Sequence, residues 1–212
     1  MTRFDEAGYW VGSDNPETAD PFGYDSYPAH VTPLQLSIAD EIEASLLSPV
    51  LVAGCGPGYL VAELRGRGVD AWGVDMSDWA LANQAPGVSA YVFGASDLRN
   101  KGQARSVMRD VDPALVVSED MLVCLSDFEA QTLGSFLREW ASVSEVWHFV
   151  STHEIGCRWR GGREGPIEIC PYNTTGRSPD PVTGMVQLRT LAEWRTLLGP
   201  DSRIISHRGE AA

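Results

Sequence analysis

Several features that define other classes of protein are missing from this 212-residue chain. It has no run of about 18 apolar residues, the length a membrane-spanning helix needs. Its first residues, MTRFDEAGYW, are polar and acidic and lack the basic start and apolar core of a secretory signal. We therefore expect a cytoplasmic protein that does not act in a membrane.

Lysine is also scarce, and no two cysteines lie close together in the sequence. The four cysteines are widely spaced with no C-x-x-C pair, which favours reduced thiols over a disulfide framework. Lys101 is the only lysine, and the net charge is −13. Such an acidic chain should repel a nucleic-acid backbone, which argues against a nucleic-acid partner. Nothing in the sequence indicates an oligomeric state.

What is present is an alternation of short apolar strands and amphipathic helices. This pattern predicts one α/β domain over residues 1–212, with a mostly parallel sheet of six or seven strands and helices on both faces. Residues 1–32 are predicted to form an irregular arm and residues 152–185 a loop or lid. The strands are expected at 49–53, 70–75, 89–93, 114–118, 145–150 and 202–207, with another in MVQLR, and the helices at 33–47, 58–67, 78–84, 102–110, 127–141 and 190–198.

The stretch VLVAGCGPG joins a predicted strand to a predicted helix through Gly54, Gly56 and Gly58. Glycines there let the backbone turn tightly and approach a ligand, and the helix N-terminus offers N–H groups. Asp75 ends the next strand, about 20 residues further on, where a carboxylate can bind ribose hydroxyls. This spacing predicts a site for a nucleotide-type cofactor at the carboxyl edge of the sheet.

The G-x-G-x-G spacing followed by GVD resembles the class I, Rossmann-like S-adenosylmethionine-dependent methyltransferases, in particular small microbial and phage members. The resemblance covers roughly residues 40–150. It implies S-adenosyl-L-methionine as cofactor, with the loop that includes Cys55 under its methionine end. It also implies that Asp75 holds the ribose.

The same resemblance assigns residues further along the chain. Asp97 would reach the adenine amino group, although it could equally cap a turn. Met76 and Leu98 would flank the adenine ring. Asp120 would lie near the sulfonium or the methyl acceptor, with Glu119 as an equal competitor for that role.

Two departures from the family accompany the resemblance. Val52 stands where the family usually carries an acid, so the amino group of the cofactor's methionine needs another partner, such as a backbone carbonyl. The family's sheet also usually ends in an antiparallel hairpin. Here one convincing strand follows the last helix, unless MVQLR supplies the other.

Catalytic candidates are few, as methyl transfer from an activated sulfonium mainly requires positioning of the acceptor. Besides Asp120, His153 follows the fifth strand and could be a general base or an ordinary loop residue. His153, Cys157 and Cys170 could instead bind zinc, but their spacing fits no standard module, and we predict no metal. Cys55 is expected to pack and not to act as a nucleophile.

The acceptor is expected to be a small molecule. The cationic cluster Arg158, Arg160 and Arg163 could bind an anionic acceptor, or could pair with neighbouring glutamates. No N-P-P-Y segment follows the fourth strand, which argues against an adenine amino group as acceptor.

Two other functions compete with a methyltransferase. An NAD-dependent oxidoreductase is opposed by Tyr59, which replaces the third glycine of G-x-G-x-x-G, and by the absence of a Tyr-x-x-x-Lys pair. A non-catalytic relative that binds cofactor or a protein partner also stays open, because Val52 replaces the usual acid.

Overall fold

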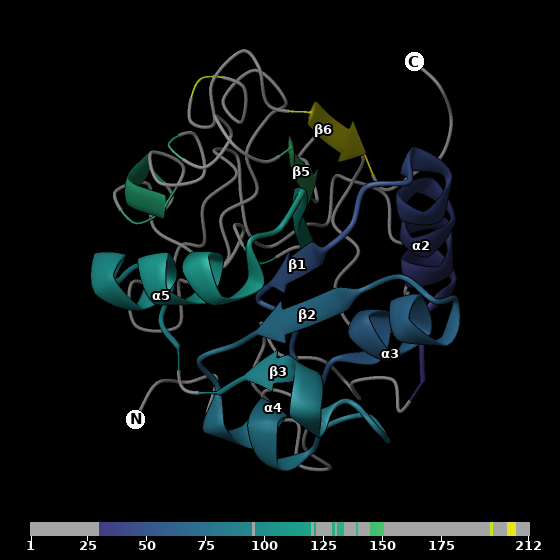
Figure 1. Cartoon of the computed structure of the whole chain (residues 1–212), viewed down its shortest axis with the longest axis horizontal. Helices are drawn as coiled ribbons and strands as arrows, with labels where there is room; N and C mark the ends of the chain where they lie inside the picture. The colour runs from purple at the N-terminus through teal and green to yellow at the C-terminus, as the bar shows by residue number, and fades with distance from the viewer. Residues whose placement is uncertain are drawn as a thin grey trace, which may run out of the picture.

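The computed structural model describes residues 30–94, 96–119, 121, 129, 131–133, 139, 145–150, 196 and 203–206. Within this part the chain alternates strands and helices (Figure 1). The strands are β1 (Val50–Ala53), β2 (Ala71–Val74), β3 (Val92–Phe93), β4 (Leu115–Glu119), β5 (Glu145–Val150) and β6 (Arg203–Ser206). The helices are α2 (Pro33–Ser45), α3 (Tyr59–Gly66), α4 (Asp78–Ala82), α5 (Lys101–Val111) and the 3₁₀ helix η2 (Ser89–Tyr91).

The six described strands form one sheet in the order β3-β2-β1-β4-β5-β6, and every neighbouring pair is parallel. The strand order reverses direction between β1 and β4, which is the position where ligands bind in open parallel sheets. This is the Rossmann-like α/β fold that the alternation of elements predicts. The last strand, β6, joins parallel to β5, and not in the antiparallel hairpin usual for the family that the sequence resembles.

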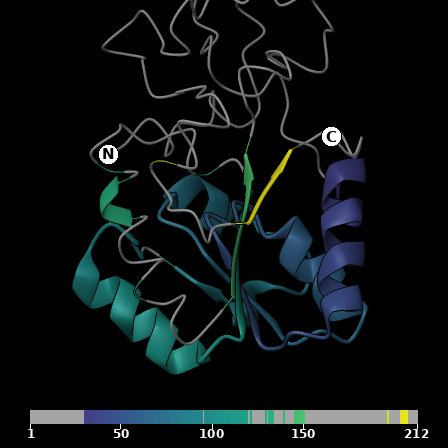
Figure 2. The ribbon, with the colours of Figure 1, turned by 90° about the horizontal axis from the view of Figure 1, so that it is seen from above.

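Helices cover both faces of the sheet (Figure 2). One face, with Val52 and Val117 at its centre, packs against α2 and α3 through Ile38, Ile42 and Leu60 in a continuous buried core. The helix α5 lies on the opposite side of the sheet and buries one apolar stripe, namely Ala104, Val107, Met108 and Val111. The core therefore holds the carboxyl ends of the strands in fixed register.

Local capping explains where several helices begin. The Thr32 hydroxyl accepts a hydrogen bond from the Gln35 backbone N–H, and the Thr32 N–H donates to the side-chain oxygen of Gln35. Pro33 follows as the first helical residue. Ser77 caps α4 by accepting from the Ala80 N–H. These caps set the start of each helix beside the carboxyl edge.

One predicted strand is mostly wrong. Residues 89–91 form η2, and only Val92 and Phe93 pair with β2. Tyr91 leaves the strand path because its ring packs under the Arg65 guanidinium, 3.8 Å from the ring centroid, and meets Trp72 edge to face.

Several predicted segments lie wholly or mostly outside the described residues. These are the arm 1–32, the helix 127–141, the loop 152–185, MVQLR and the helix 190–198. The described residues of the 127–141 segment, Glu129, Gln131 to Leu133 and Glu139, are helical. Within the described part of the chain, we find no helix with the length and apolar character needed to span a membrane.

Candidate cofactor site at the carboxyl edge

The glycine loop requires glycine at each of its three alternate positions. Gly54, Gly56 and Gly58 have φ of 68°, 53° and 86°, a left-handed conformation that costs other residues energy. A Cβ on Gly54 would also lie 2.6 Å from the Cγ of Met121, which follows β4. The loop is thus a tight turn between β1 and the N-terminus of α3, as the sequence predicts.

The end of β2 is tied to this loop through both backbone and side chain. The Val74 carbonyl accepts hydrogen bonds from the backbone N–H groups of Gly54 and Cys55. The Asp75 carboxylate accepts from the Gly56 N–H and from the Ser77 N–H, each at 2.8 Å. Asp75 therefore joins the glycine loop to the cap of α4 and is a half-buried, oriented carboxylate at the edge of the sheet.

Cys55 is a packing residue in this loop. Burial and the nearby negative charge of Asp75 raise the pKa of its thiol well above its usual value. Its sulfur lies against Gly73, where a Cβ would be 2.7 Å away. A thiol that is buried and hard to ionise is a poor nucleophile, in agreement with the sequence-based expectation.

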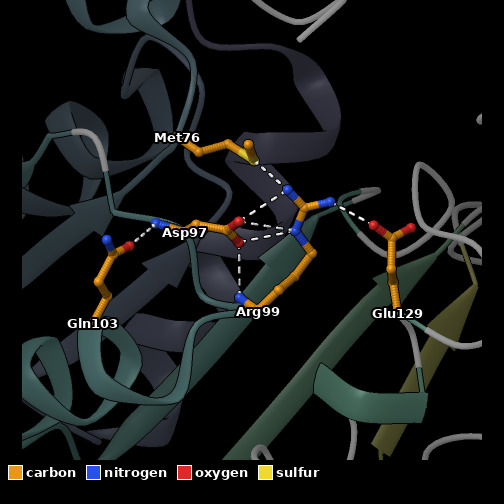
Figure 3. A network of polar contacts seen from close by, with 5 residues as sticks. All are labelled: Met76, Asp97, Arg99, Gln103 and Glu129. Carbon is orange, nitrogen blue, oxygen red and sulfur yellow. Dashed lines mark hydrogen bonds and ion pairs between the residues drawn. The ribbon is translucent and has the colours of Figure 1, made fainter. Parts of the chain in front are cut away.

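Asp97, predicted to contact adenine, lies in an ion-pair network after β3 (Figure 3). Its carboxylate accepts from the Arg99 backbone N–H and from Nε and Nη2 of the Arg99 side chain, at 2.9 to 3.1 Å. Burial opposes ionisation of Asp97, but the bonds and charge of Arg99 outweigh it, so the pKa of Asp97 is lowered. The Ser96 N–H also bonds the Asp75 carbonyl, which brings this segment beside β2.

Arg99 connects three segments of the chain. Besides Asp97 it pairs with Glu129, and its Nη2 lies 3.6 Å from the sulfur of Met76 (Figure 3). Met76 is half-buried and Leu98 is buried. The structure thus brings together Asp75, Met76, Asp97 and Leu98, and the sequence reasoning missed Arg99, which contacts Met76 and Asp97.

Two further polar pairs escaped the sequence reasoning. Gln35 of α2 donates from its side-chain amide to the Glu119 carboxylate at the end of β4, over 2.9 Å. Ser118 and His148 are fully buried neighbours on β4 and β5, with Oγ and Nδ1 2.8 Å apart. Burial lowers the pKa of His148 to about 4. For Ser118 and His148, the only signal in the sequence was a single polar residue within each of two apolar strands.

Asp120 and His153, the candidate catalytic residues, lie outside the described residues, as do Arg158, Arg160 and Arg163. Among the described residues no group of three His, Cys, Asp or Glu side chains could hold a metal ion.

No protein-family model matches the chain, and no curated protein sequence was found to be similar. Similar solved structures include human N-acetylserotonin methyltransferase, with 15% identity and a TM-score of 0.50 over 78% of this chain and 45% of that one. Magnesium protoporphyrin IX methyltransferase from Synechocystis matches at 23% identity and a TM-score of 0.41, over 65% and 59% of the two chains. An NAD-bound dTDP-glucose 4,6-dehydratase from Bacillus anthracis matches at 10% and 0.42, over 74% and 53%.

The matched region spans about half the length of these solved structures. At this level of identity the likeness establishes the fold alone. The chain therefore has a Rossmann-like fold, as the human N-acetylserotonin methyltransferase does.

Proposed function

We propose that this protein is an S-adenosylmethionine-dependent methyltransferase. The observation that carries the proposal is the direct hydrogen bond between the Asp75 carboxylate and the Gly56 N–H. It joins a loop of three left-handed glycines to a carboxylate at the switch point of the sheet. A nucleoside with a charged tail suits such an edge, because the loop admits close backbone approach while the carboxylate accepts from ribose hydroxyls.

The cofactor would lie along the edge from β1 to β3. Its methionine end would sit over the glycine loop and its ribose at Asp75. The adenine ring would lie between Met76 and Leu98. Arg99 donates to both oxygens of the Asp97 carboxylate. A hydrogen bond from the adenine amino group to Asp97 would therefore require one of the Arg99 hydrogen bonds to weaken or break.

Chemistry at this site would consist mainly of holding the acceptor in line with the methyl group. We assign Asp120 to the neighbourhood of the sulfonium or acceptor and His153 to proton removal from the acceptor. The acceptor would be a small molecule, and an anionic one if Arg158, Arg160 and Arg163 face it. We also propose that residues 152–185 form a lid that binds the acceptor.

Thermal unfolding with S-adenosylhomocysteine and with NAD tests the proposal. At about 100 times its Kd, S-adenosylhomocysteine should raise Tm by about 5–10 °C, and NAD should leave it unchanged. A rise in Tm with NAD alone would instead indicate an NAD-dependent oxidoreductase. A shift with neither would favour a non-catalytic relative.

A further inference from the structure

Asp97 is held in place by backbone contacts as well as by the Arg99 side chain. Its backbone N–H donates to the side-chain oxygen of Gln103 at 2.7 Å, and its Oδ1 accepts from the Arg99 backbone N–H at 2.9 Å. The Arg99 side chain adds Nε and Nη2, which donate to the two carboxylate oxygens (Figure 3). Because the first two contacts need no particular side chain at position 99, Asp97 should keep its place when the guanidinium is removed.

The Arg99 guanidinium lies where the edge of the adenine ring is proposed to bind. Its Nη2 is 3.6 Å from Sδ of Met76, which would flank the ring, and donates to Asp97, which would meet the amino group. Glu129 accepts from Nη1 on the other side of the guanidinium (Figure 3). A guanidinium held from two sides can release one Asp97 oxygen and still stay beside the base.

The Asp97–Arg99 pair is partly shielded from solvent. The Arg99 and Asp97 side chains are 28% and 32% exposed, whereas Arg105 of α5, which also forms an ion pair, is 59% exposed. A guanidinium has five N–H donors and no acceptor, and an ionised carboxylate only accepts. The pair therefore offers a bound base one donor and one acceptor side by side.

Purines differ at position 6 in what they would exchange with this pair. The amino group of adenine donates, so it would replace one Arg99 donor on the Asp97 carboxylate. The 6-oxo group of hypoxanthine accepts, so it would replace one Asp97 oxygen as the acceptor of an Arg99 donor. Either exchange breaks one hydrogen bond of the pair and forms one with the base. Without the guanidinium, a 6-oxo group would face the carboxylate with no side-chain donor between the two acceptors, which is unfavourable.

We propose that Arg99 determines which purine the cofactor site accepts, and that it allows a 6-oxopurine to bind nearly as well as adenine. This inference rests on the proposed function, which brings the base to Asp97, Met76 and Leu98. Asp97 alone would select a 6-amino group. Asp97 together with Arg99 can satisfy an amino group or an oxo group at the same position.

Calorimetric titration of the full-length chain with S-adenosylhomocysteine and with its hypoxanthine analogue, S-inosylhomocysteine, tests the proposal. The wild type should bind the two ligands with affinities within about tenfold of each other. Arg99→Met should raise the preference for S-adenosylhomocysteine by about 10- to 100-fold, the effect of one charge-assisted hydrogen bond. The ratio of the two affinities is the readout, because a merely structural role of Arg99 would weaken both ligands equally.

The matched control is Arg105→Met, which removes an arginine that pairs with Glu139 on the exposed surface of α5 and should leave the ratio unchanged. An unchanged ratio in Arg99→Met, or a wild-type preference for S-adenosylhomocysteine well above about tenfold, overturns the inference. Should Arg99→Met fail to fold, Arg99→Gln replaces it, with a smaller rise in the ratio expected and no rise overturning the inference. Wild-type protein that binds neither ligand would refute the proposed function itself, and the inference with it.

Discussion

Asp75 performs two tasks that compete for the same carboxylate oxygens. It holds the glycine loop and the cap of α4 through backbone N–H groups, and in the proposed complex it also accepts from the ribose. The loop and the ligand therefore depend on one side chain. An exposed strand end would tolerate its removal, but a half-buried carboxylate with two backbone donors would not.

Asp75→Ala should consequently weaken both binding and folding. We expect affinity for S-adenosylhomocysteine to fall by about 1.5–3 kcal/mol and the free energy of unfolding to fall by about 1–3 kcal/mol. Calorimetry and urea unfolding measure the two effects. Asp110→Asn, an exposed change on α5, is the control. Unchanged affinity in Asp75→Ala would show that Asp75 does not hold the ribose.

His148 makes folding stability depend on pH. Its pKa is about 4 in the folded protein against 6.5 as its ordinary value, so the unfolded chain takes up a proton first as pH falls. The stability contributed by neutral His148 is complete above pH 6.5 and is lost between about pH 6.5 and 4. Between pH 7.5 and 5 the loss should be about 2 kcal/mol.

Urea unfolding at the two pH values tests this dependence. The double variant Ser118→Ala/His148→Leu removes the titrating ring together with the hydroxyl beside it. Its loss of stability between pH 7.5 and 5 should be smaller than that of the wild type by about 2 kcal/mol. An identical loss in the two proteins would mean that His148 is not the group responsible.

At the scale of elements, the glycine loop is constrained by its own backbone and by the segment that follows β4. Gly54→Ala would combine a left-handed φ with a Cβ 2.6 to 2.8 Å from the Met121 side chain. We expect a loss of about 2–4 kcal/mol in the free energy of unfolding, part from strain and part from the clash. Gly66→Ala at the end of α3, where a Cβ meets nothing within 4 Å, should be neutral or stabilising.

A double variant separates the two causes. Met121→Ala should restore the part of the Gly54→Ala loss that comes from the clash and leave about 1 kcal/mol of backbone strain. Additive losses in the double variant would show that Met121 does not pack on the loop.

Most elements were predictable because their signals are local. Apolar periodicity places helices and strands within about two residues, and the glycine spacing indicates the turn before α3. The prediction of a strand at 89–93 failed because the Tyr91 ring packs under the guanidinium of Arg65, a residue distant in sequence. Contacts between remote residues carry no such signal: Gln35 and Glu119 are 84 positions apart, and Ser118 and His148 are 30 apart.

At the scale of the whole molecule, the strand order explains how these contacts combine into one site. The sheet places β4, β1, β2 and β3 side by side, so Glu119, the glycine loop, Asp75 and Asp97 follow one another along a single edge. In the proposed complex, the methionine end, the ribose and the adenine of the cofactor would follow the same order along this edge. The sequence shows each carboxylate after its own strand, but their alignment appears only once the strands are ordered.

A crystal structure of the full chain with S-adenosylhomocysteine tests the central claim most directly. We predict the ribose hydroxyls within hydrogen-bond distance of the Asp75 carboxylate, the adenine between Met76 and Leu98, and the homocysteine backbone over residues 54–58. A ligand bound elsewhere, or a carboxyl edge that stays empty at saturating ligand, would contradict the account.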